Sequence, residues 1–228
     1  MGQQSDALVI FAKYPEPGKV KTRLGRDIGN ERAAELYRAF LLDLAERFTP
    51  APNSDGYDTL WARAPGEGSL AEIVGKEAPI FPQRGESLGD RLYLAAEDVR
   101  QLGYRRMIVV GSDAPHLPVA YVCEAFTLLT TSDAVFGPAQ DGGYYLAGLH
   151  VRPELADLFR GIEMSTPSVL ADTLRRTRDL GMRAALLPAL FDVDEITEVQ
   201  RLAGLLKSGT EFAAPHTHAA LRRLNLLG

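Results

Sequence analysis

The sequence predicts an α/β fold with a single, mostly parallel sheet that is covered by helices on both faces. Short β-branched apolar runs at 7–12 and 107–110 have the character of buried strands. Stretches with helical spacing of apolar residues separate such runs, and the separations are too long for hairpins. Hydrophobic residues make up 46% of the 228 residues and charged residues 24%, which is typical of a globular chain.

The first half of the chain contains two strong elements and several weaker ones. Residues 7–12 predict a strand that ends in the loop 14–18, which holds two prolines and a glycine. From Asn30, a suitable N-cap, apolar residues recur at helical spacing as far as position 48. Weaker strands are expected at 59–64 and 79–82. Ser87 and Asp90 form an acidic variant of the capping box, which predicts a helix with apolar positions at 88, 92, 95, 96, 99 and 102.

The second half continues the alternation of strands and helices. The run 107–110 is the clearest strand, and a helix is expected from about 118 to 130. Short strands at 134–136 and 144–147 flank the loop 140–143. Thr166 and Pro167 look like the N-cap and first residue of a helix that ends near Gly181. A strand at 184–191 and a helix at 196–206 complete one domain over residues 1–207. Residues 208–228 are expected to form a tail with room for one short helix, in which His216 and His218 are solvated.

Charge is distributed unevenly along the chain. The net charge is −5, which argues against a general partner among nucleic acids or anionic membranes. Residues 13–26 nevertheless carry five basic side chains and one acidic one, a local excess that suits a small polyanion. No apolar run is long enough to cross a membrane. With a single cysteine, Cys123, and no apolar leader at the start, we expect a cytoplasmic protein.

The basic segment follows directly on the first predicted strand. Lys13 stands at the end of that strand, and Gly18, Lys21, Thr22 and Arg23 follow in a loop shaped by glycine and proline. Ligands of open α/β sheets bind outside the carboxyl ends of the strands. Backbone amides, a hydroxyl group and several cations at that place suit the phosphates of a nucleotide. A solvated cationic loop is the alternative.

Four carboxylates are candidates for binding a metal ion or a substrate. Asp113 follows the strand 107–110 and is well placed to hold a hard divalent cation together with phosphate oxygens of a substrate. The alternative for Asp113 is a helix cap or an Asx turn. Asp192 and Asp194 form an acidic pair at the end of a later predicted strand, and in a doubly wound sheet the two strand ends can meet. Asp141 lies before two glycines, where a ligand can approach closely or an Asp-Gly hairpin turn can form.

Five motifs together resemble one bacterial family. They stand at residues 11–24, 83–91, 111–117, 141–149 and 192–194, in family order. In sequence and in order, these motifs are similar to those of the DUF2064 family. Members of that family are described as glycosyltransferases, and some are linked to arsenosugar synthesis. The resemblance implies the glycosyltransferase-A fold of the nucleotide-diphospho-sugar transferase superfamily, with its Rossmann-like sheet. Relatives in that superfamily carry a D-x-D-T-P-E-D-L segment, and this chain departs from it at 195–197, where it has Glu-Ile-Thr. Many sugar transferases have a D-x-D motif where this chain has S-D-A-P around Asp113.

The resemblance also implies roles for individual residues. It implies a nucleotide above the loop after the first strand, with Mg²⁺ or Mn²⁺ held by Asp113 and Asp194. Lys21 and Asp141 are the candidate catalytic residues. The expected nucleotide and phosphate contacts are Lys13, Gly18, Lys21, Thr22, Arg23, Gln83, Leu88 and Gly89. The expected substrate contacts are Asp141, Gly142, Gly143 and Tyr144.

Three functions remain open at this point. A glycosyltransferase uses a nucleotide sugar, and a nucleotidyltransferase passes a nucleotide from a nucleoside triphosphate to a phosphorylated small molecule and releases pyrophosphate. The family description favours glycosyl transfer to a small-molecule acceptor, whereas the five cations favour a triphosphate. We expect glycosyl transfer, with nucleotidyl transfer as the alternative. A nucleotide-binding regulator without catalysis is the third hypothesis, and the presence of both Asp113 and Asp194 argues against it.

Overall fold

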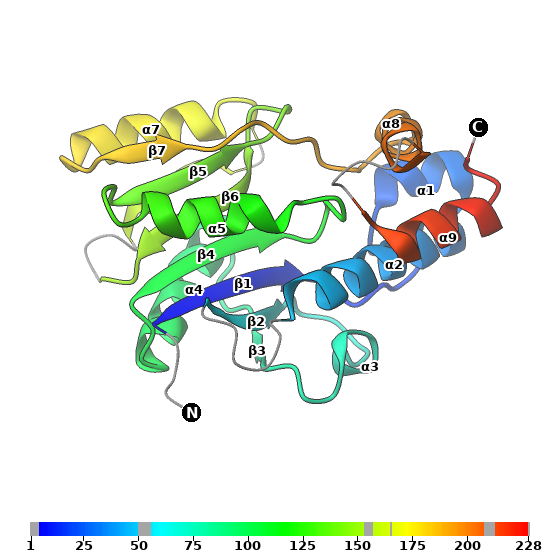
Figure 1. The fold of residues 1–228 in the computed structure, drawn as a ribbon, viewed down its shortest axis with the longest axis horizontal. Coiled ribbons are helices and arrows are strands. Elements are labelled where there is room, and N and C mark those ends of the chain that lie inside the picture. The colour runs from blue at the N-terminus through cyan, green and yellow to red at the C-terminus, as the bar shows by residue number, and fades with distance from the viewer. Residues whose placement is uncertain (1–4, 50–55, 153–156, 165, 208–212, 228) are drawn as a thin grey trace.

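A twisted seven-stranded sheet forms the centre of the computed structural model, which describes residues 5–49, 56–152, 157–164, 166–207 and 213–227 (Figure 1). Its strands are β1 (Asp6–Ala12), β2 (Asp58–Arg63), β3 (Ile80–Pro82), β4 (Arg106–Gly111), β5 (Ala134–Pro138), β6 (Tyr144–His150) and β7 (Ala184–Leu186). They lie in the order β3-β2-β1-β4-β6-β5-β7. The predicted fold class, a single mostly parallel sheet, is confirmed.

Only β6 runs against its neighbours. It pairs antiparallel with both β4 and β5, whereas the other pairings are parallel. β5 and β6 form a hairpin closed by residues 139–143, in which Ala139 N–H donates to the carbonyl of Gly143 at 3.0 Å. The expectation that no spacing is short enough for a hairpin is therefore wrong at this place. The alternative of an Asp-Gly hairpin turn at residues 141 and 142 is the one that the structure supports.

Helices cover both faces of the sheet, as predicted. They are α1 (Thr22–Ile28), α2 (Asn30–Phe48), α3 (Ala71–Val74), α4 (Leu88–Gln101), α5 (Val119–Leu128), the 3-10 turn η1 (Asp157–Phe159), α7 (Val169–Asp179), α8 (Ile196–Lys207) and α9 (Pro215–Arg223). One core lies between the sheet and α2, α5, α8 and α9, and the other between the sheet and α4, η1 and α7. No helix in the described part of the chain has the length and hydropathy needed to cross a membrane.

The side chains of strand β1 contribute to both cores. Successive side chains of a strand point to opposite faces of the sheet. Leu8 and Ile10 belong to the core under α2 and α5, while Ala7 and Val9 belong to the core under α4. All four are fully buried. This is why the central strand reads as continuous apolar sequence rather than as an alternating pattern.

The start of α4 agrees with its prediction in detail. The Ser87 hydroxyl accepts from Asp90 N–H at 3.0 Å, and the Asp90 carboxylate accepts from Ser87 N–H at 3.3 Å. The apolar face of the helix is narrower than expected. Leu88 and Leu102, at its two ends, are 42% and 51% exposed, because both lie beyond the turns that face the sheet.

Several predicted boundaries differ from the structure. Thr22 and Arg23 begin helix α1 and do not belong to a loop. Helix α7 begins at Val169, not at Pro167, because residues 166–168 form a turn against the loop before β6. The last strand stops at Leu186, ahead of Pro188, which has no N–H for a sheet hydrogen bond.

The segment after α8 is packed where the described residues resume. Thr217 and Leu221 of α9 are fully buried against α2. The Asp43 carboxylate of α2 accepts from the backbone N–H groups of His216 and Thr217 at 2.9 and 2.7 Å. The His216 ring is exposed and pairs with Glu46 at 2.9 Å. The expected short helix is present as α9, and the His216 ring is exposed as expected. The segment is not a separate tail, because α9 covers part of the core.

Candidate active site

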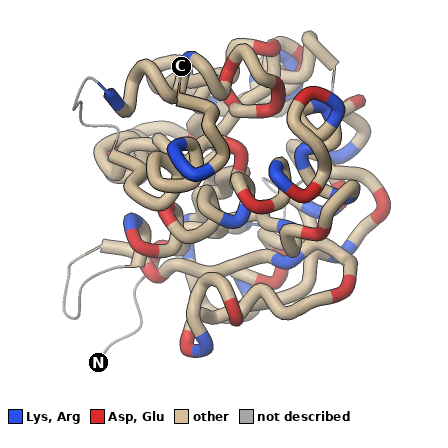
Figure 2. Tube along the Cα trace, turned by 90° about the vertical axis from the view of Figure 1, so that its right-hand side faces the viewer, with Lys and Arg blue, Asp and Glu red and all other residues tan. Residues whose placement is uncertain are grey.

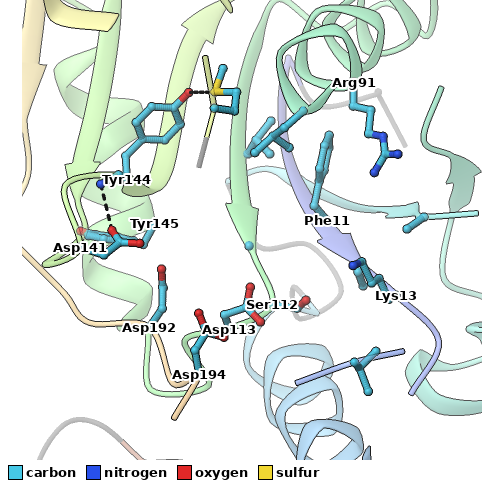
Figure 3. A pocket seen from close by; sticks show the side chains of 18 of the residues that line it. Phe11, Lys13, Arg91, Ser112, Asp113, Asp141, Tyr144, Tyr145, Asp192 and Asp194 are labelled. Atoms are coloured by element: carbon cyan, nitrogen blue, oxygen red, sulfur yellow. Dashed lines mark hydrogen bonds between the residues drawn. The ribbon is translucent and has the colours of Figure 1, made fainter. Parts of the chain in front are cut away.

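A cavity of about 630 Å³ opens at the carboxyl ends of β1 and β4 (Figure 3). Its walls come from the loop after β1, the start of α1, the start of α4, the β5–β6 hairpin and residues 192–194. These segments are far apart in the sequence and meet because β1 and β4 are neighbours in the sheet. The cavity therefore occupies the position at which open α/β sheets bind ligands.

Most of the predicted site residues line this cavity. Those that do are Lys13, Lys21, Thr22, Arg23, Gln83, Leu88, Asp113, Asp141, Gly143, Tyr144 and Asp194. Three others, Gly18, Gly89 and Gly142, are not part of its lining. The phosphate-binding, metal-binding and substrate-binding groups expected from the sequence thus share one space.

Gly89 and Gly142 are required by packing within the protein. A Cβ on Gly89 would lie 2.4 Å from the carbonyl oxygen of Phe159, so a side chain there would separate α4 from η1. A Cβ on Gly142, whose φ is +92°, would lie 2.0 Å from the carbonyl oxygen of Pro167. The space beside Gly142 is therefore filled by the chain itself. The expectation that it leaves room for a substrate is wrong.

Lys21 is the centre of the charged part of the site. Its amine donates to Oδ1 of Asp113 and, at 2.8 Å, to Oδ1 of Asp194. The Lys21 side chain is 3% exposed, whereas the two carboxylates are 44% and 46% exposed. Lys21 is thus directed at two carboxylates and not at the open cavity. It lies where the sequence placed it, but in this arrangement it positions the aspartates.

Backbone contacts hold the three segments together. Val193 N–H donates to the carbonyl of Asp113 at 2.9 Å, and Leu24 N–H donates to the carbonyl of Asp194 at 3.1 Å. Lys21 itself has φ 46° and ψ 45°, a left-handed conformation that costs a residue with a side chain about 1–2 kcal/mol. Such strain persists where the surrounding structure enforces it. The arrangement of lysine and aspartates is therefore built into the backbone.

The electrostatics follow from burial and from this cluster. Burial alone would lower the pKa of Lys21, but the carboxylates of Asp113 and Asp194 outweigh it and raise that pKa, so the amine stays charged. Asp192 faces the same cavity (Figure 3). Burial, followed by repulsion from Asp113 and Asp194, raises the pKa of Asp192 to about 7.

Tyr37 of α2 supports the cluster from behind. Its hydroxyl forms a 2.7 Å hydrogen bond with Oγ of Ser112 and accepts from Lys13 N–H at 3.1 Å. It thereby connects the ends of β1 and β4. Burial, with a smaller contribution from Asp113, raises the pKa of Tyr37 to about 12, so the hydroxyl stays protonated. The apolar pattern of α2 predicted only a core position here.

Cationic side chains also line the cavity. Arg23 pairs at 3.6 Å with Glu195, the residue after Asp194, and Lys19 pairs with Glu16 at 2.7 Å. Lys13, Lys19, Arg23 and Arg91 belong to the lining, and Figure 3 shows Lys13 and Arg91 beside Phe11 and across from Asp141 and Asp192. Along the chain at this end of the molecule, basic and acidic residues lie close together (Figure 2). Arg91 was not predicted as a site residue. It lies on the capping-box helix, where it reads as an ordinary surface residue.

The side chains of Gln83 and Asp141 each form a hydrogen bond with a backbone group. Nε2 of the buried Gln83 donates to the carbonyl of Ala62 at 2.7 Å, which fixes the amide at the edge of the cavity. Oδ1 of Asp141 accepts from Gly143 N–H at 2.9 Å, which is an Asx turn. The turn alternative for Asp141 is therefore present in the structure. Its carboxylate also lines the cavity, so a role toward the substrate remains a prediction.

The donor set fits a divalent cation that is shared with a substrate. Two carboxylates, each about half exposed, contribute oxygen atoms at the cavity, and hard cations prefer such ligands. Among the described residues no group of three or more His, Cys, Asp or Glu side chains is arranged to hold a metal ion. Asp113 and Asp194 therefore suit Mg²⁺ or Mn²⁺ when phosphate oxygens complete the coordination.

Comparisons with known proteins agree with this geometry. The model of a family described as an uncharacterized protein conserved in bacteria (DUF2064) matches residues 50–166. A phosphoenolpyruvate guanylyltransferase from Chloroflexus aggregans (strain MD-66 / DSM 9485) is 32% identical over 135 residues, 58% of this chain. The alignment covers 63% of that relative, less than two thirds of its length.

Solved structures extend the likeness to nearly the whole chain. The crystal structure of a candidate nucleotide-diphospho-sugar transferase from Desulfovibrio desulfuricans G20 has 33% identity and a TM-score of 0.89, with 99% of this chain and 97% of that chain covered. A cytidylyltransferase from Leptospira borgpetersenii serovar Hardjo-bovis (strain JB197) has 11% identity and a TM-score of 0.59, with 99% and 97% covered, and shows the shared fold. The protein therefore has the nucleotide-diphospho-sugar transferase fold and belongs to the DUF2064 family.

Proposed function

We propose that this transferase uses a nucleoside triphosphate with a divalent metal ion and passes the nucleotidyl group to a phosphorylated small molecule. The observation that carries the proposal is the pairing, in one cavity, of four cationic side chains with two half-exposed carboxylates ordered by a buried lysine. A triphosphate needs cations along its length and a metal ion at the reacting phosphorus, and this cavity offers both kinds of group.

Each part of the cavity has a task in this reaction. Lys13, Lys19 and Arg23 neutralise phosphate oxygens, while Asp113 and Asp194 hold the metal ion, which supplies further neutralisation of charge. An oxygen atom of the acceptor attacks the α-phosphorus, the bond from that phosphorus to the bridging oxygen breaks, and pyrophosphate leaves. Because the acceptor supplies the nucleophile, catalysis rests on position and charge and needs no nucleophile from the protein.

The guanylyltransferase relative supports nucleotidyl transfer over the glycosyl transfer that the family description favours. It is a homologue with a named reaction, although the alignment covers only part of it. Glycosyl transfer stays the second candidate because of the hairpin side of the cavity. There Asp141 presents a carboxylate at the cavity, a group that can bind sugar hydroxyls. The Tyr144 ring also lines the cavity, and its hydroxyl donates to the sulfur of Met164 at 3.8 Å.

The two reactions release different products, which makes them separable. The protein is incubated with Mg²⁺ and either the four nucleoside triphosphates or a panel of nucleotide sugars. Phosphorylated acceptors, beginning with phosphoenolpyruvate, are added to each. Pyrophosphate release that depends on the acceptor supports nucleotidyl transfer. Release of a nucleoside diphosphate from a nucleotide sugar supports glycosyl transfer instead.

Matched variants link the activity to this cavity. We expect Lys13→Ala and Arg23→Ala to weaken nucleotide binding, since a hydrogen bond to a charged group contributes about 1.5–3 kcal/mol. Lys76→Ala and Arg38→Ala remove the same charges at exposed positions outside the cavity lining and are the controls. Equal losses of affinity in all four variants, measured by calorimetry at constant salt, would contradict the assignment of the phosphate side.

A further inference from the structure

A second cavity lies at the other end of the sheet from the candidate active site. It has a volume of about 500 Å³, and its described lining contains four arginines and no acidic residue. The lining residues are Ser5, Arg100, Tyr104, Arg105, Arg106, Leu129, Thr130, His150, Val151 and Arg152. We call it the arginine pocket. Such a concentration of positive charge is unexpected in a chain whose net charge is −5.

The arginine pocket is separate from the active-site cavity. Its lining includes Arg105 and Arg106, where β4 begins, whereas the lining of the active site includes Gly111, where β4 ends. Figure 1 shows the two ends of this strand. Strand β4 has six residues, and at about 3.3 Å per residue its first and last Cα atoms are about 17 Å apart. The two cavities have no lining residue in common. A ligand in one does not reach the other.

Backbone pairing holds the arginines together. Arg106 is paired with His150 in the register of β4 and β6, and Val151 N–H donates to the carbonyl of Arg105 at 3.0 Å. Arg105 and Arg152 are therefore carried by two chain segments that hydrogen bonds tie side by side. The position of these charges depends on the sheet and not on a loose loop.

Two of the four arginines are neutralised and two are not. Arg106 forms two hydrogen bonds with the Asp6 carboxylate, at 2.8 and 2.5 Å, and Arg100 pairs with Glu97 at 3.0 Å. Arg105 and Arg152 are exposed, and within the described parts of the chain no carboxylate lies within 4.0 Å of either guanidinium. Arg105 and Arg152 thus line a concave site with no carboxylate partner among the residues that the structure describes.

We propose that the arginine pocket is a second anion-binding site, which takes a small phosphorylated molecule. Guanidinium groups match the geometry of phosphate oxygens and bind them in pairs of parallel hydrogen bonds. The arginines surround a hollow of limited volume, which suits a small ligand. The net negative charge of the whole chain disfavours a long polyanion on the surface around it.

Binding of inorganic pyrophosphate and of inorganic phosphate, measured by calorimetry at constant ionic strength, tests the proposal. The pocket variant is the double substitution Arg105→Ala/Arg152→Ala. The matched control is Arg38→Ala/Arg222→Ala, which removes the same charge at exposed positions outside both cavities. A third protein, Lys13→Ala/Arg23→Ala, weakens the phosphate side of the active-site cavity. Circular dichroism of each variant confirms that it is folded.

We expect two classes of pyrophosphate site in the unaltered protein and in the control. The pocket variant loses one class by tenfold or more, where tenfold equals about 1.4 kcal/mol, and the Lys13→Ala/Arg23→Ala protein loses the other. The proposal is overturned if the pocket variant binds as the unaltered protein does, or if the control loses as much affinity as the pocket variant. Since the active-site variant is measured separately, failure of the proposed transferase activity does not alter this result.

Discussion

Replacing Lys21 by methionine tests whether this buried amine orders the carboxylates of Asp113 and Asp194. Methionine keeps the length and the apolar stem of the side chain but removes the charge. Asp113 and Asp194 then face each other, with Asp192 nearby, and lose the cation that both contact. We expect a loss of stability and a loss of turnover together.

The size of the stability loss can be worked out from burial. Removing one partner of a buried ion pair costs about 3–5 kcal/mol. Here the lysine is buried, but the side chains of Asp113 and Asp194 are 44% and 46% exposed, so water screens the charges that remain. We therefore expect a loss of about 1–3 kcal/mol in the free energy of unfolding. For a chain of this size each kcal/mol lowers Tm by about 2–4 °C.

The pH dependence has a defined sign. The pKa of Lys21 is raised in the folded protein above its usual value of 10.5. The stabilisation is then fully present below pH 10.5 and is lost as the pH rises through the folded value. The assay can therefore be made at neutral pH, where the amine is charged in the folded and in the unfolded chain.

Urea unfolding of Lys21→Met, of the unaltered protein and of the exposed control Lys76→Ala measures the effect. Steady-state turnover is measured on the same preparations. An unfolding free energy of Lys21→Met within 0.5 kcal/mol of the control value would refute the electrostatic argument. Normal turnover with reduced stability would show that Lys21 has a structural role alone.

Further expectations concern pH, the hairpin loop and the metal ion. Burial, together with Arg47 and Arg201, lowers the pKa of His116 to about 3. Below pH 6.5 this histidine is protonated in the unfolded chain but not in the folded one, which lowers the free energy of unfolding by up to about 1.4 kcal/mol per pH unit. The slope of the unfolding free energy against pH should therefore be smaller in His116→Phe. Asp141→Asn retains an oxygen that can accept from Gly143 N–H, so the variant should fold normally. If Asp141 is a general base, turnover should fall by about 10²–10⁴-fold. Turnover at the wild-type rate would show that Asp141 serves the turn alone. Gly142→Ala should fail to fold or lose several kcal/mol in urea unfolding, because its Cβ would lie 2.0 Å from a carbonyl oxygen. In crystals with Mn²⁺, anomalous density between Asp113 and Asp194 should depend on added nucleotide, and density at a different place would count against this pair.

Local sequence was sufficient for the elements whose signals lie within a few residues. The capping box of Ser87 and Asp90 is a contact between neighbours in the chain, so its residues alone identify the start of α4. The apolar run of β1 likewise indicates a strand buried on both faces. Boundaries that depend on distant contacts were missed. The start of α7 is one, since Leu170 N–H donates to the carbonyl of Gly142.

The sequence by itself indicated most of the groups that line the cavity, because the charged and glycine-rich motifs lie directly after predicted strands and such strand ends meet at one edge of an α/β sheet. It did not indicate Arg91 or Tyr37. Only the tertiary structure decided what these groups contact. Lys21 meets Asp113 and Asp194 across separations of 92 and 173 residues, and no local pattern shows that the lysine faces these carboxylates and not the open cavity. The arginine pocket depends in the same way on the antiparallel pairing of β4 and β6, which brings Arg105 beside Arg152. Contacts of this kind are set by strand order and register, and these follow from packing the whole chain at once.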